Sequence, residues 1–131
     1  MQDRPTATEL LGAVRSFLER EVVPAFEGRR RFHALVAANV LAVVERELAG
    51  EERQLLGEWR RLAALLGVRG DEPVRLELLR DGVRALDAEL TRRLREGDAD
   101  EGPFGEGVRR HLRATVVEKL RVANPRHLGE P

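Results

Sequence analysis

The chain has 131 residues, of which 42% are hydrophobic and 35% are charged, with 23 basic and 23 acidic residues. This length suits one domain with a real core, and the composition excludes a disordered chain and a membrane protein. The balanced charge argues against nucleic-acid binding, because proteins of that class usually carry a basic surplus. Without cysteine the chain has no disulfide, thiolate metal site or thiol nucleophile.

The sequence predicts neither a membrane span nor a secretory signal. The longest uncharged run, from His33 to Val44, has twelve residues, which is short of the ~20 that a bilayer requires. The N-terminal sequence MQDRPTATELL has no apolar run behind a basic start. We therefore expect a cytoplasmic location. The scarcity of Asn and Gln favours a thermophilic source, although a GC-rich genome produces the same Arg and Ala bias.

Helical periodicity dominates the first half of the chain, and no segment alternates apolar and polar residues for long. The first predicted helix begins with Thr6 and Glu9 at the spacing of a capping box, and Pro24 either ends it or starts a new turn. A second helix is predicted over 29–49, ending near Gly50. Because this second helix is apolar on most sides, we expect it at the centre of the protein.

The second half of the chain also reads as helical. Helices are predicted over 51–66, from about Pro73 to Gly97, and over 106–123, with an acidic, Gly-containing loop at 98–105. Short connections between long helices favour antiparallel neighbours. We therefore predict an all-α fold: a single up-and-down bundle of about five helices.

One domain is predicted to cover residues 1–131, with loose ends at 1–5 and 126–131. No internal repeat has a solenoid period, and no linker is long enough to divide the chain. The domain prediction therefore follows from the length and from the short connections.

The residues of several well-known reaction centres are missing. There is no phosphate-binding G-x-x-x-x-G-K-[ST] loop, no G-x-G-x-x-G behind a strand and no H-E-x-x-H. The only serine, Ser16, lies inside a predicted helix, so a nucleophile elbow is excluded. No glutamate has a histidine three residues later, so the ligands of a di-iron bundle are absent. We expect no catalytic residues and no cofactor, and an enzyme is the less favoured reading.

Two polar residues, His33 and Asn39, stand in the apolar second helix. They are six positions apart, so they point about 120° away from each other on the helix. We expect each to bond a neighbouring helix and to set how the helices dock. The alternative is that one of them lines a ligand cavity.

Three arginines, Arg29, Arg30 and Arg31, directly precede that apolar run. If the helix begins near Gly28, these cations lie at its positive end, where the dipole disfavours them by a few tenths of a kcal/mol each. An acidic neighbour such as Glu27 or Glu21 would offset this cost, and the cost does not arise if the helix instead begins at Pro24. A phosphate or carboxylate ligand is the other possibility, since helix N–H groups and Arg side chains suit oxyanions.

A further group of basic and polar residues lies on the last predicted helix and just after it. Arg109 and Arg113 are four positions apart and share a face. Cations near a helix C-terminus also suit its dipole. The three histidines have no metal-ligand spacing, so no metal site is expected. The ligand-binding candidates are Arg29, Arg30, Arg31, His33, Asn39, Arg113, Lys119, Asn124 and Arg126.

Three runs of the sequence, RPTATELLGAVRSFLEREVVP, GRRRFHALVAANVLAVVEREL and LRATVVEKLRVANPRHL, are distinctive. Together they resemble a bacterial family of unknown function whose members are often encoded beside aminoglycoside-phosphotransferase-like kinases and acyl-CoA dehydrogenases. The resemblance implies a small α-helical protein that works near those enzymes, and it implies no catalytic residues. The positions that match the distinctive segments are His33, Asn39, Arg46, Glu47, Arg113, Lys119, Asn124 and Arg126.

Two functions remain open from the sequence. The first is a non-enzymatic accessory protein that contacts a kinase-like or acyl-CoA-processing enzyme and self-associates through a leftover apolar stripe. The alternative is a ligand-binding module, in which Arg29–Arg31 and the Arg113/Lys119 face hold a phosphorylated or acyl-CoA-type ligand.

Overall fold

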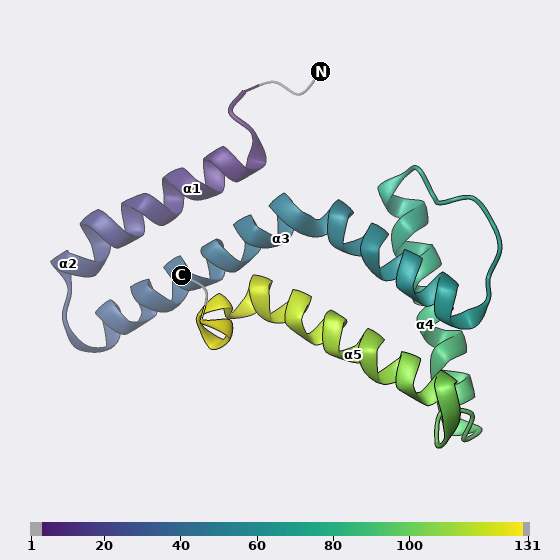
Figure 1. Cartoon of the computed structure of the whole chain (residues 1–131). Helices are drawn as coiled ribbons and strands as arrows, with labels where there is room; N and C mark the ends of the chain where they lie inside the picture. Colours follow the sequence, from purple (N-terminus) through teal and green to yellow (C-terminus); the bar gives the residue numbers. More distant parts are fainter. Residues whose placement is uncertain (1–3, 130–131) are drawn as a thin grey trace. The chain divides into compact units, whose positions relative to one another are not determined.

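The computed structural model of the protein describes residues 4–129, which are helical with no strand (Figure 1). Its elements are α1 (Ala7–Phe17), a π-helical turn η1 (Leu18–Val22), α2 (Val23–Ala25), α3 (Gly28–Leu66), α4 (Leu76–Arg95), α5 (Gly102–Ala123) and a 3-10 turn η2 (Pro125–Leu128). The all-α prediction is thus confirmed for this range. None of these helices combines the length and the hydrophobicity that crossing a membrane requires.

The predicted break at Gly50 is wrong, because α3 runs through this position as one helix of 39 residues. A glycine that ends a helix normally adopts a positive φ. Gly50 is not among the glycines with positive φ, and it is buried within the helix. The described chain therefore has four long helices, α1, α3, α4 and α5, where about five were predicted.

Other predicted helix boundaries are met more closely. Thr6 and Glu9 form both hydrogen bonds of the capping box, with Oε2 of Glu9 2.7 Å from the Thr6 amide nitrogen. Gly67 and Gly97 follow helix ends with φ of 69° and 86°. The predicted loop at 98–105 is shorter than expected, because α5 already begins at Gly102.

The other differences lie at the remaining chain ends and helix starts. The start of α4 falls at Leu76 instead of near Pro73. Within the predicted C-terminal loose end, Arg126 to Leu128 belong to the 3-10 turn η2. Residues 1–3 and 130–131 of the predicted loose ends lie outside the described residues.

The chain forms two compact units. Unit 1 contains the residues up to Gly50 together with Val122–Pro125, and unit 2 contains Glu51–Arg121 and the residues from Arg126 onward. The prediction of a single domain and a single up-and-down bundle stays a prediction. Each unit is described by itself below.

In unit 1, α1 and the first half of α3 lie side by side as a helical hairpin (Figure 1). Two small residues of α3, Ala34 and Ala38, are buried and allow the close approach of the two helices. The guanidinium of Arg15 donates from Nε to both carboxylate oxygens of Glu45 at 3.1 Å. This pair joins the two helices at a position where the Glu45 side chain is only 15% exposed.

Unit 2 has the larger apolar core, built from the second part of α3, α4 and α5. Leu62 of α3 is fully buried and packs in one cluster with Val83 and Leu90 of α4 and Val108 of α5. The spacing of such residues at three, four and seven positions gives each helix one inward face. The core thereby fixes which side chains of the three helices face one another.

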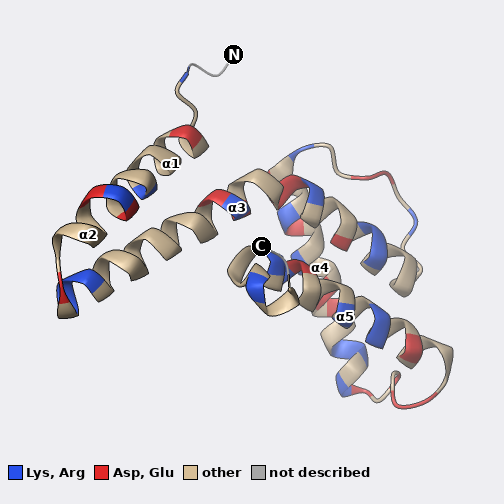
Figure 2. Cartoon of the chain, turned by 60° about the vertical axis from the view of Figure 1, so that its left-hand side comes forward, with Lys and Arg blue, Asp and Glu red and all other residues tan. Residues whose placement is uncertain are grey.

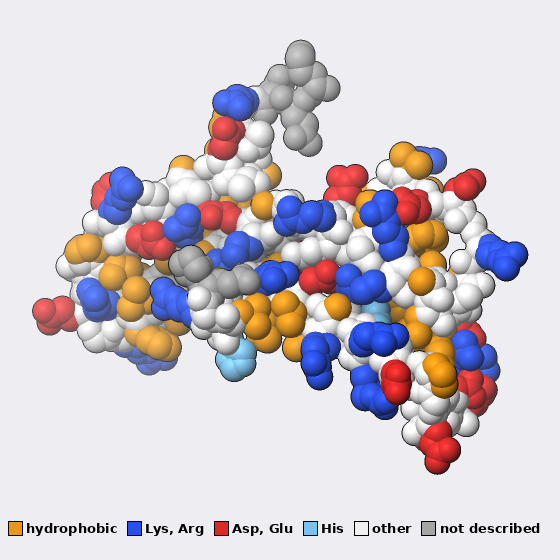
Figure 3. All heavy atoms as spheres, in the orientation of Figure 1, with side chains coloured by type: hydrophobic (Ala, Val, Ile, Leu, Met, Phe, Trp, Pro, Cys, Tyr) orange, Lys and Arg blue, Asp and Glu red, His pale blue; other side chains and the backbone are white. Residues whose placement is uncertain are grey.

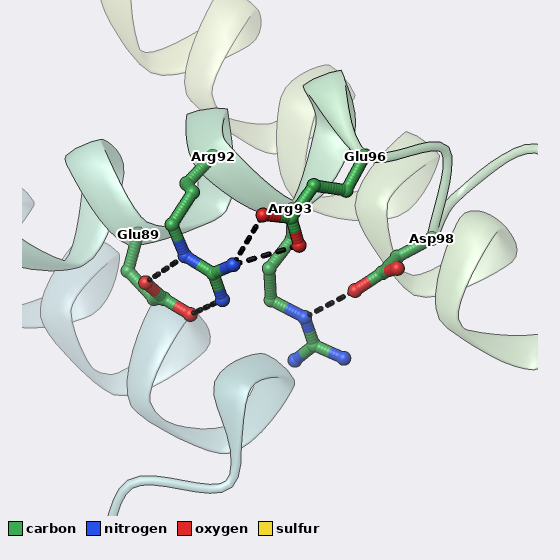
Figure 4. A network of polar contacts seen from close by, with 5 residues as sticks. All are labelled: Glu89, Arg92, Arg93, Glu96 and Asp98. Atoms are coloured by element: carbon green, nitrogen blue, oxygen red, sulfur yellow. Dashed lines mark hydrogen bonds and ion pairs between the residues drawn. The ribbon is translucent and has the colours of Figure 1, made fainter.

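The C-terminal end of α4 carries a network of ion pairs (Figure 4). Arg92 lies between Glu89 and Glu96, with its nitrogens 2.6–2.9 Å from their carboxylate oxygens. Arg93 donates to Asp98 at 2.9 Å, and its guanidinium lies 4.2 Å from the ring centre of Phe104. Cations suit a helix C-terminus, but exposed pairs of this kind add little stability.

Candidate functional site

The two polar residues of the apolar run are both exposed on α3. The expectation that this apolar helix lies at the centre of the protein is wrong for this part of α3, because Phe32, Leu35, Val36 and Val40 are exposed. Its buried face in unit 1 consists of small residues, Ala34 and Ala38, and the larger apolar residues point elsewhere. Within residues 4–129 neither His33 nor Asn39 hydrogen-bonds a neighbouring helix through its side chain. The ring of His33 instead lies beside Phe32, with 6.0 Å between ring centres.

The three arginines occupy the first turn of α3, since that helix begins at Gly28 with a φ of 58°. No ion pair with Glu21 or Glu27 offsets their charge in the part of the chain that the structure describes. Instead Arg31 donates from Nη1 to the backbone carbonyl of Val23 at 3.2 Å. The guanidinium of Arg30 lies 5.8 Å from the ring centre of Phe26. Arg31 is thus bound by a backbone carbonyl at the start of α2, and Arg30 by an aromatic ring.

Unit 1 exposes an unusual amount of apolar surface. On α3 the exposed fractions are 62% for Phe32, 45% for Leu35, 44% for Val36 and 53% for Val40. We call these four residues the unit 1 apolar face. Figure 3 shows hydrophobic side chains at the surface around α2 and the start of α3. On α1 three further hydrophobic residues are about half exposed: Leu10, Val14 and Phe17.

Charges of opposite sign flank the unit 1 apolar face along α3. Figure 2 shows a long uncharged run of α3 that begins after the arginines and ends at the next group of charged residues. Helical geometry places Arg29, Val36, Val40 and Glu47 within about 40° of one another around the helix axis. Within residues 4–129 neither Arg29 nor Glu47 has an ion-pair partner. We call this row of four residues the α3 stripe.

The last helix carries a basic groove in unit 2, which we call the α5 groove. It has a volume of about 600 Å³ and contains Arg113, one of the predicted ligand-binding residues. Basic side chains follow α5 in Figure 3. The residues that line the groove are Glu106, Arg109, Arg110, Arg113, Ala114, Val117, Glu118 and Arg121.

The other predicted candidates of this region do not line the α5 groove. Lys119 is exposed on α5, Asn124 follows the end of that helix, and Arg126 is exposed in η2. Arg113 thus shares the α5 groove with three other arginines of α5, and not with the other predicted ligand-binding residues.

Three ionisable side chains of unit 2 lie close together. Glu58 comes from α3, Asp87 from α4 and His111 from α5. One carboxylate oxygen of each acid and one imidazole nitrogen lie within 4.8 Å of one another. We call these residues the unit 2 triad. His111 is only 5% exposed, and its Nδ1 atom is buried without a hydrogen-bond partner.

The surroundings shift the pKa values of two members of the unit 2 triad, Glu58 and His111. Burial raises the pKa of Glu58, and the negative charge of Asp87 raises it further. Burial lowers the pKa of His111, and the nearby Arg61 guanidinium acts in the same direction. Leaving a polar group buried and unpaired costs about 1–3 kcal/mol. Of the triad only His111 is buried and neither carboxylate is, so the site is only partly desolvated.

A second groove on the same unit borders one member of the unit 2 triad, His111, whereas Glu58 and Asp87 are not among its lining residues. This groove has a volume of about 700 Å³, and Arg61 and His111 are among its lining residues together with Leu65, Phe104 and Gly107. A side chain that is almost fully buried thus still borders a space that small solutes can enter.

The unit 2 triad was not predicted from the sequence. Its members lie 29 and 24 positions apart, on three different helices, so no local spacing marks them. The side chains that lie close to His111 are carboxylates, and neither His33 nor His127 belongs to the group. A histidine that falls on the apolar side of its helix, as His111 does beside Val108, is the one signal that points to it.

The comparisons with known proteins identify a family but no activity. The family model described as "Domain of unknown function (DUF6285)" matches residues 24–127. No curated protein and no solved structure matches the chain.

Proposed function

We propose that this chain, which belongs to the family of domains of unknown function DUF6285, is a small non-enzymatic interaction protein. In this proposal it pairs with a second copy of itself and serves as an accessory subunit of a kinase-like or acyl-CoA-processing enzyme. The observation that carries the proposal is the unit 1 apolar face. Its four residues lie within nine positions of α3 and are all about half exposed or more.

Such a face is costly to leave in water. Full burial of a Phe, Leu or Val side chain is worth about 1.5–3 kcal/mol relative to exposure, and Phe32 alone is 62% exposed. Soluble monomers rarely expose large contiguous apolar patches, and those that occur usually mark interaction sites. The apolar face therefore supports association with another protein surface.

The charges of the α3 stripe favour a second copy as that surface. In a two-fold symmetric pair, the same patch of both copies is in contact. If the two α3 helices run antiparallel, Arg29 of one copy faces Glu47 of the other, and Val36 faces Val40. The stripe is thus complementary to itself in both charge and hydrophobicity.

Analytical ultracentrifugation of the wild-type protein and of two matched variants tests this pairing. Val40 and Val116 are almost equally exposed, at 53% and 54%, but only Val40 belongs to the α3 stripe. We expect a wild-type dimer, a monomer for Val40→Glu and an unchanged dimer for Val116→Glu. A wild-type monomer at high micromolar concentration, or a dimer that tolerates Val40→Glu, would contradict the proposal.

The enzyme partner is supported by the resemblance to a bacterial family encoded beside such enzymes. Kinases and acyl-CoA-processing enzymes of this kind act in the cytoplasm, so the proposal places the protein there. Co-expression with the neighbouring kinase-like enzyme, followed by size exclusion, is the direct test. We expect the two proteins to co-elute; separate elution with no effect on the activity or stability of the kinase would exclude the accessory role.

A thermophilic source is a separate proposal that rests on the amino-acid composition. The chain has two Asn and two Gln residues in 131 positions, and thermolabile residues are scarce in proteins of thermophiles. A thermal melt checks it: a midpoint in the mesophilic range of about 45–65 °C would count against this source.

The α5 groove supports a second candidate function, the binding of a phosphorylated or acyl-CoA-type ligand. Arg109, Arg110 and Arg113 line it together with the apolar Ala114 and Val117. Arginine side chains bind phosphate through paired hydrogen bonds, and the apolar residues suit an adenine ring or an acyl chain. This candidate would give the accessory protein a regulatory ligand.

Thermal shift with ATP and acetyl-CoA at millimolar concentration tests the groove, because a ligand of the folded state raises the melting temperature by mass action. We expect Arg113→Ala to reduce the shift. Arg84→Ala serves as the control, since Arg84 is exposed on α4 and does not line the groove. Arg30→Ala reports in the same assay whether the arginines of α3 contribute instead. An absent shift, or one that Arg113→Ala leaves unchanged, would exclude the groove.

A further inference from the structure

We propose that the unit 2 triad, Glu58, Asp87 and His111, binds one divalent transition-metal ion and fits Zn²⁺ best. Each of three helices supplies one ligand atom, and these atoms lie within 4.8 Å of one another. This site is independent of the self-association and of the α5 groove.

The donor set matches the chemistry of such an ion. Imidazole nitrogen and carboxylate oxygen are ordinary ligands of Zn²⁺, at distances of about 2.0–2.2 Å. Mn²⁺ and Fe²⁺ accept the same donors, and without thiolates a soft ion is disfavoured. Two carboxylates and one neutral imidazole also balance the charge of a divalent cation.

The geometry requires only a small contraction. Three ligands around a tetrahedral zinc ion lie about 3.4 Å apart, compared with separations of up to 4.8 Å in the triad. Zinc sites with three protein ligands keep a fourth position for water or a substrate.

A second observation, independent of the clustering, is the presence of unpartnered buried atoms on α5. His111 is 5% exposed and Thr115 is 9% exposed. Neither Nδ1 of His111 nor Oγ1 of Thr115 has a hydrogen-bond partner. The two residues are four positions apart and so share one face of the helix. Buried polar atoms normally have partners, so the unpartnered Nδ1 of His111, a member of the triad, points to a group that binds here.

The charged side chains around the triad do not take the place of a metal ion. Arg61 is held by Glu118, through two hydrogen bonds of 2.7 and 3.0 Å. Lys119 lowers the pKa of Glu58 by its charge, but within residues 4–129 it makes no ion pair with that carboxylate. Both acids of the triad therefore lack a bonded cation in the described structure.

Co²⁺ absorption and Zn²⁺ titration calorimetry on the untagged protein test the proposal. Co²⁺ reports its ligand geometry by visible absorption bands, and calorimetry gives the stoichiometry. We expect one ion per chain and a higher melting temperature with Zn²⁺. Glu58→Gln and Asp87→Asn should each weaken binding at least tenfold, since loss of an outer-shell group alone typically costs 10–100-fold.

Matched variants separate this site from adventitious binding at the surface. Asp81→Asn removes an exposed carboxylate from the same helix as Asp87, and His33→Gln removes an exposed histidine from unit 1. Both should bind Zn²⁺ as the wild type does. Circular dichroism of the metal-free variants establishes that they are folded. The assignment would be overturned if the wild type did not bind Zn²⁺ at millimolar concentration. It would also be overturned if folded Asp87→Asn and Glu58→Gln proteins bound Zn²⁺ with the affinity of the wild type.

Discussion

Glu118 on α5 accepts two hydrogen bonds from Arg61 on α3, one from each terminal guanidinium nitrogen, at 2.7 and 3.0 Å. The two side chains are 26% and 28% exposed, so water screens the pair only in part. This relationship has a consequence for the neighbouring triad. Because Glu118 engages Arg61, the carboxylates of Glu58 and Asp87 remain next to His111 without a bonded arginine.

The first prediction concerns the stability contributed by this ion pair. Glu118→Gln removes the carboxylate charge and should lower the free energy of unfolding by about 1 kcal/mol, at the upper end for partly exposed pairs. Urea denaturation measures it. Glu72→Gln is the control, because its pair with Arg60 is more exposed, at 44% and 58%, and should contribute nothing measurable. Equal effects of the two substitutions would contradict the role of partial burial.

The second prediction is a pH dependence at Glu58 in the metal-free protein. Burial and Asp87 raise the pKa of this carboxyl group from its ordinary value of 4.5, so the folded chain binds the proton more readily than the unfolded chain. The resulting stabilisation is fully present below the unfolded pKa and is lost as the pH rises through the folded pKa. The amide of Glu58→Gln does not ionise, so the variant keeps this stabilisation at all pH values. It should therefore be more stable than the wild type at neutral pH.

Thermal melts of the wild type and of Glu58→Gln between pH 4 and 7 measure this difference. The comparison isolates Glu58 from His111, whose lowered pKa acts in the opposite direction and is common to both proteins. We expect the advantage of the variant to shrink as the pH falls. An advantage that does not depend on pH would mean that Glu58 does not titrate in this environment.

The third prediction concerns the ends of the α3 stripe. In the proposed antiparallel dimer, Arg29→Glu and Glu47→Arg each place like charges opposite each other. The two-fold dimer contains two such pairs, and each exposed pair contributes up to about 1 kcal/mol, so each substitution should weaken dimerisation by up to about thirtyfold. The double variant restores opposite charges and should recover the wild-type dissociation constant, as measured by sedimentation equilibrium.

A control variant distinguishes this pairing from a general effect of charge. Arg84→Glu changes the net charge as Arg29→Glu does, but Arg84 lies on α4 of unit 2, and dimerisation should not respond. If the double variant were as weak as the single ones, the antiparallel arrangement would be wrong.

The fourth prediction concerns Gly105, near the start of α5. A Cβ atom built at this position would collide with the backbone carbonyl of Ala99, and a backbone group cannot move aside as a side chain can. Gly105→Ala should therefore cost about 1–3 kcal/mol. At Gly57 of α3 the nearest contact of a Cβ is an ordinary van der Waals distance of 3.4 Å, to Nη1 of the Arg61 side chain. Gly57→Ala should instead raise the free energy of unfolding by about 0.5–1 kcal/mol. Urea denaturation of the two variants should therefore give changes of opposite sign in the free energy of unfolding.

Local features of the fold could be predicted from the sequence, because they depend on neighbours in the chain. Hydrophobic periodicity indicates helices, and the Thr6–Glu9 spacing is confirmed as a capping box. Gly67 and Gly97 are confirmed as residues that follow helix ends. Each signal acts within one or two helical turns, which is the range over which backbone hydrogen bonds and caps operate.

The error at Gly50 has a physical cause of the same local kind. A glycine permits a helix to end, but it does not require it to. Gly50 is buried and its φ is not positive, so here the absence of a side chain serves packing inside α3. The exposure of Phe32 and Val40 could not be predicted from the sequence either. A row of apolar residues shows that a helix has an apolar face, but it does not show what covers that face.

The candidate site of unit 2 depends on tertiary structure alone. Glu58, Asp87 and His111 come from three helices, and the spacing of these residues along the chain carries no signal. They meet because the apolar core around Leu62 and Val108 sets the rotation of each helix about its axis. Periodicity establishes that each helix has an inward face, whereas the packing of three such faces determines which polar side chains share the space beside the core.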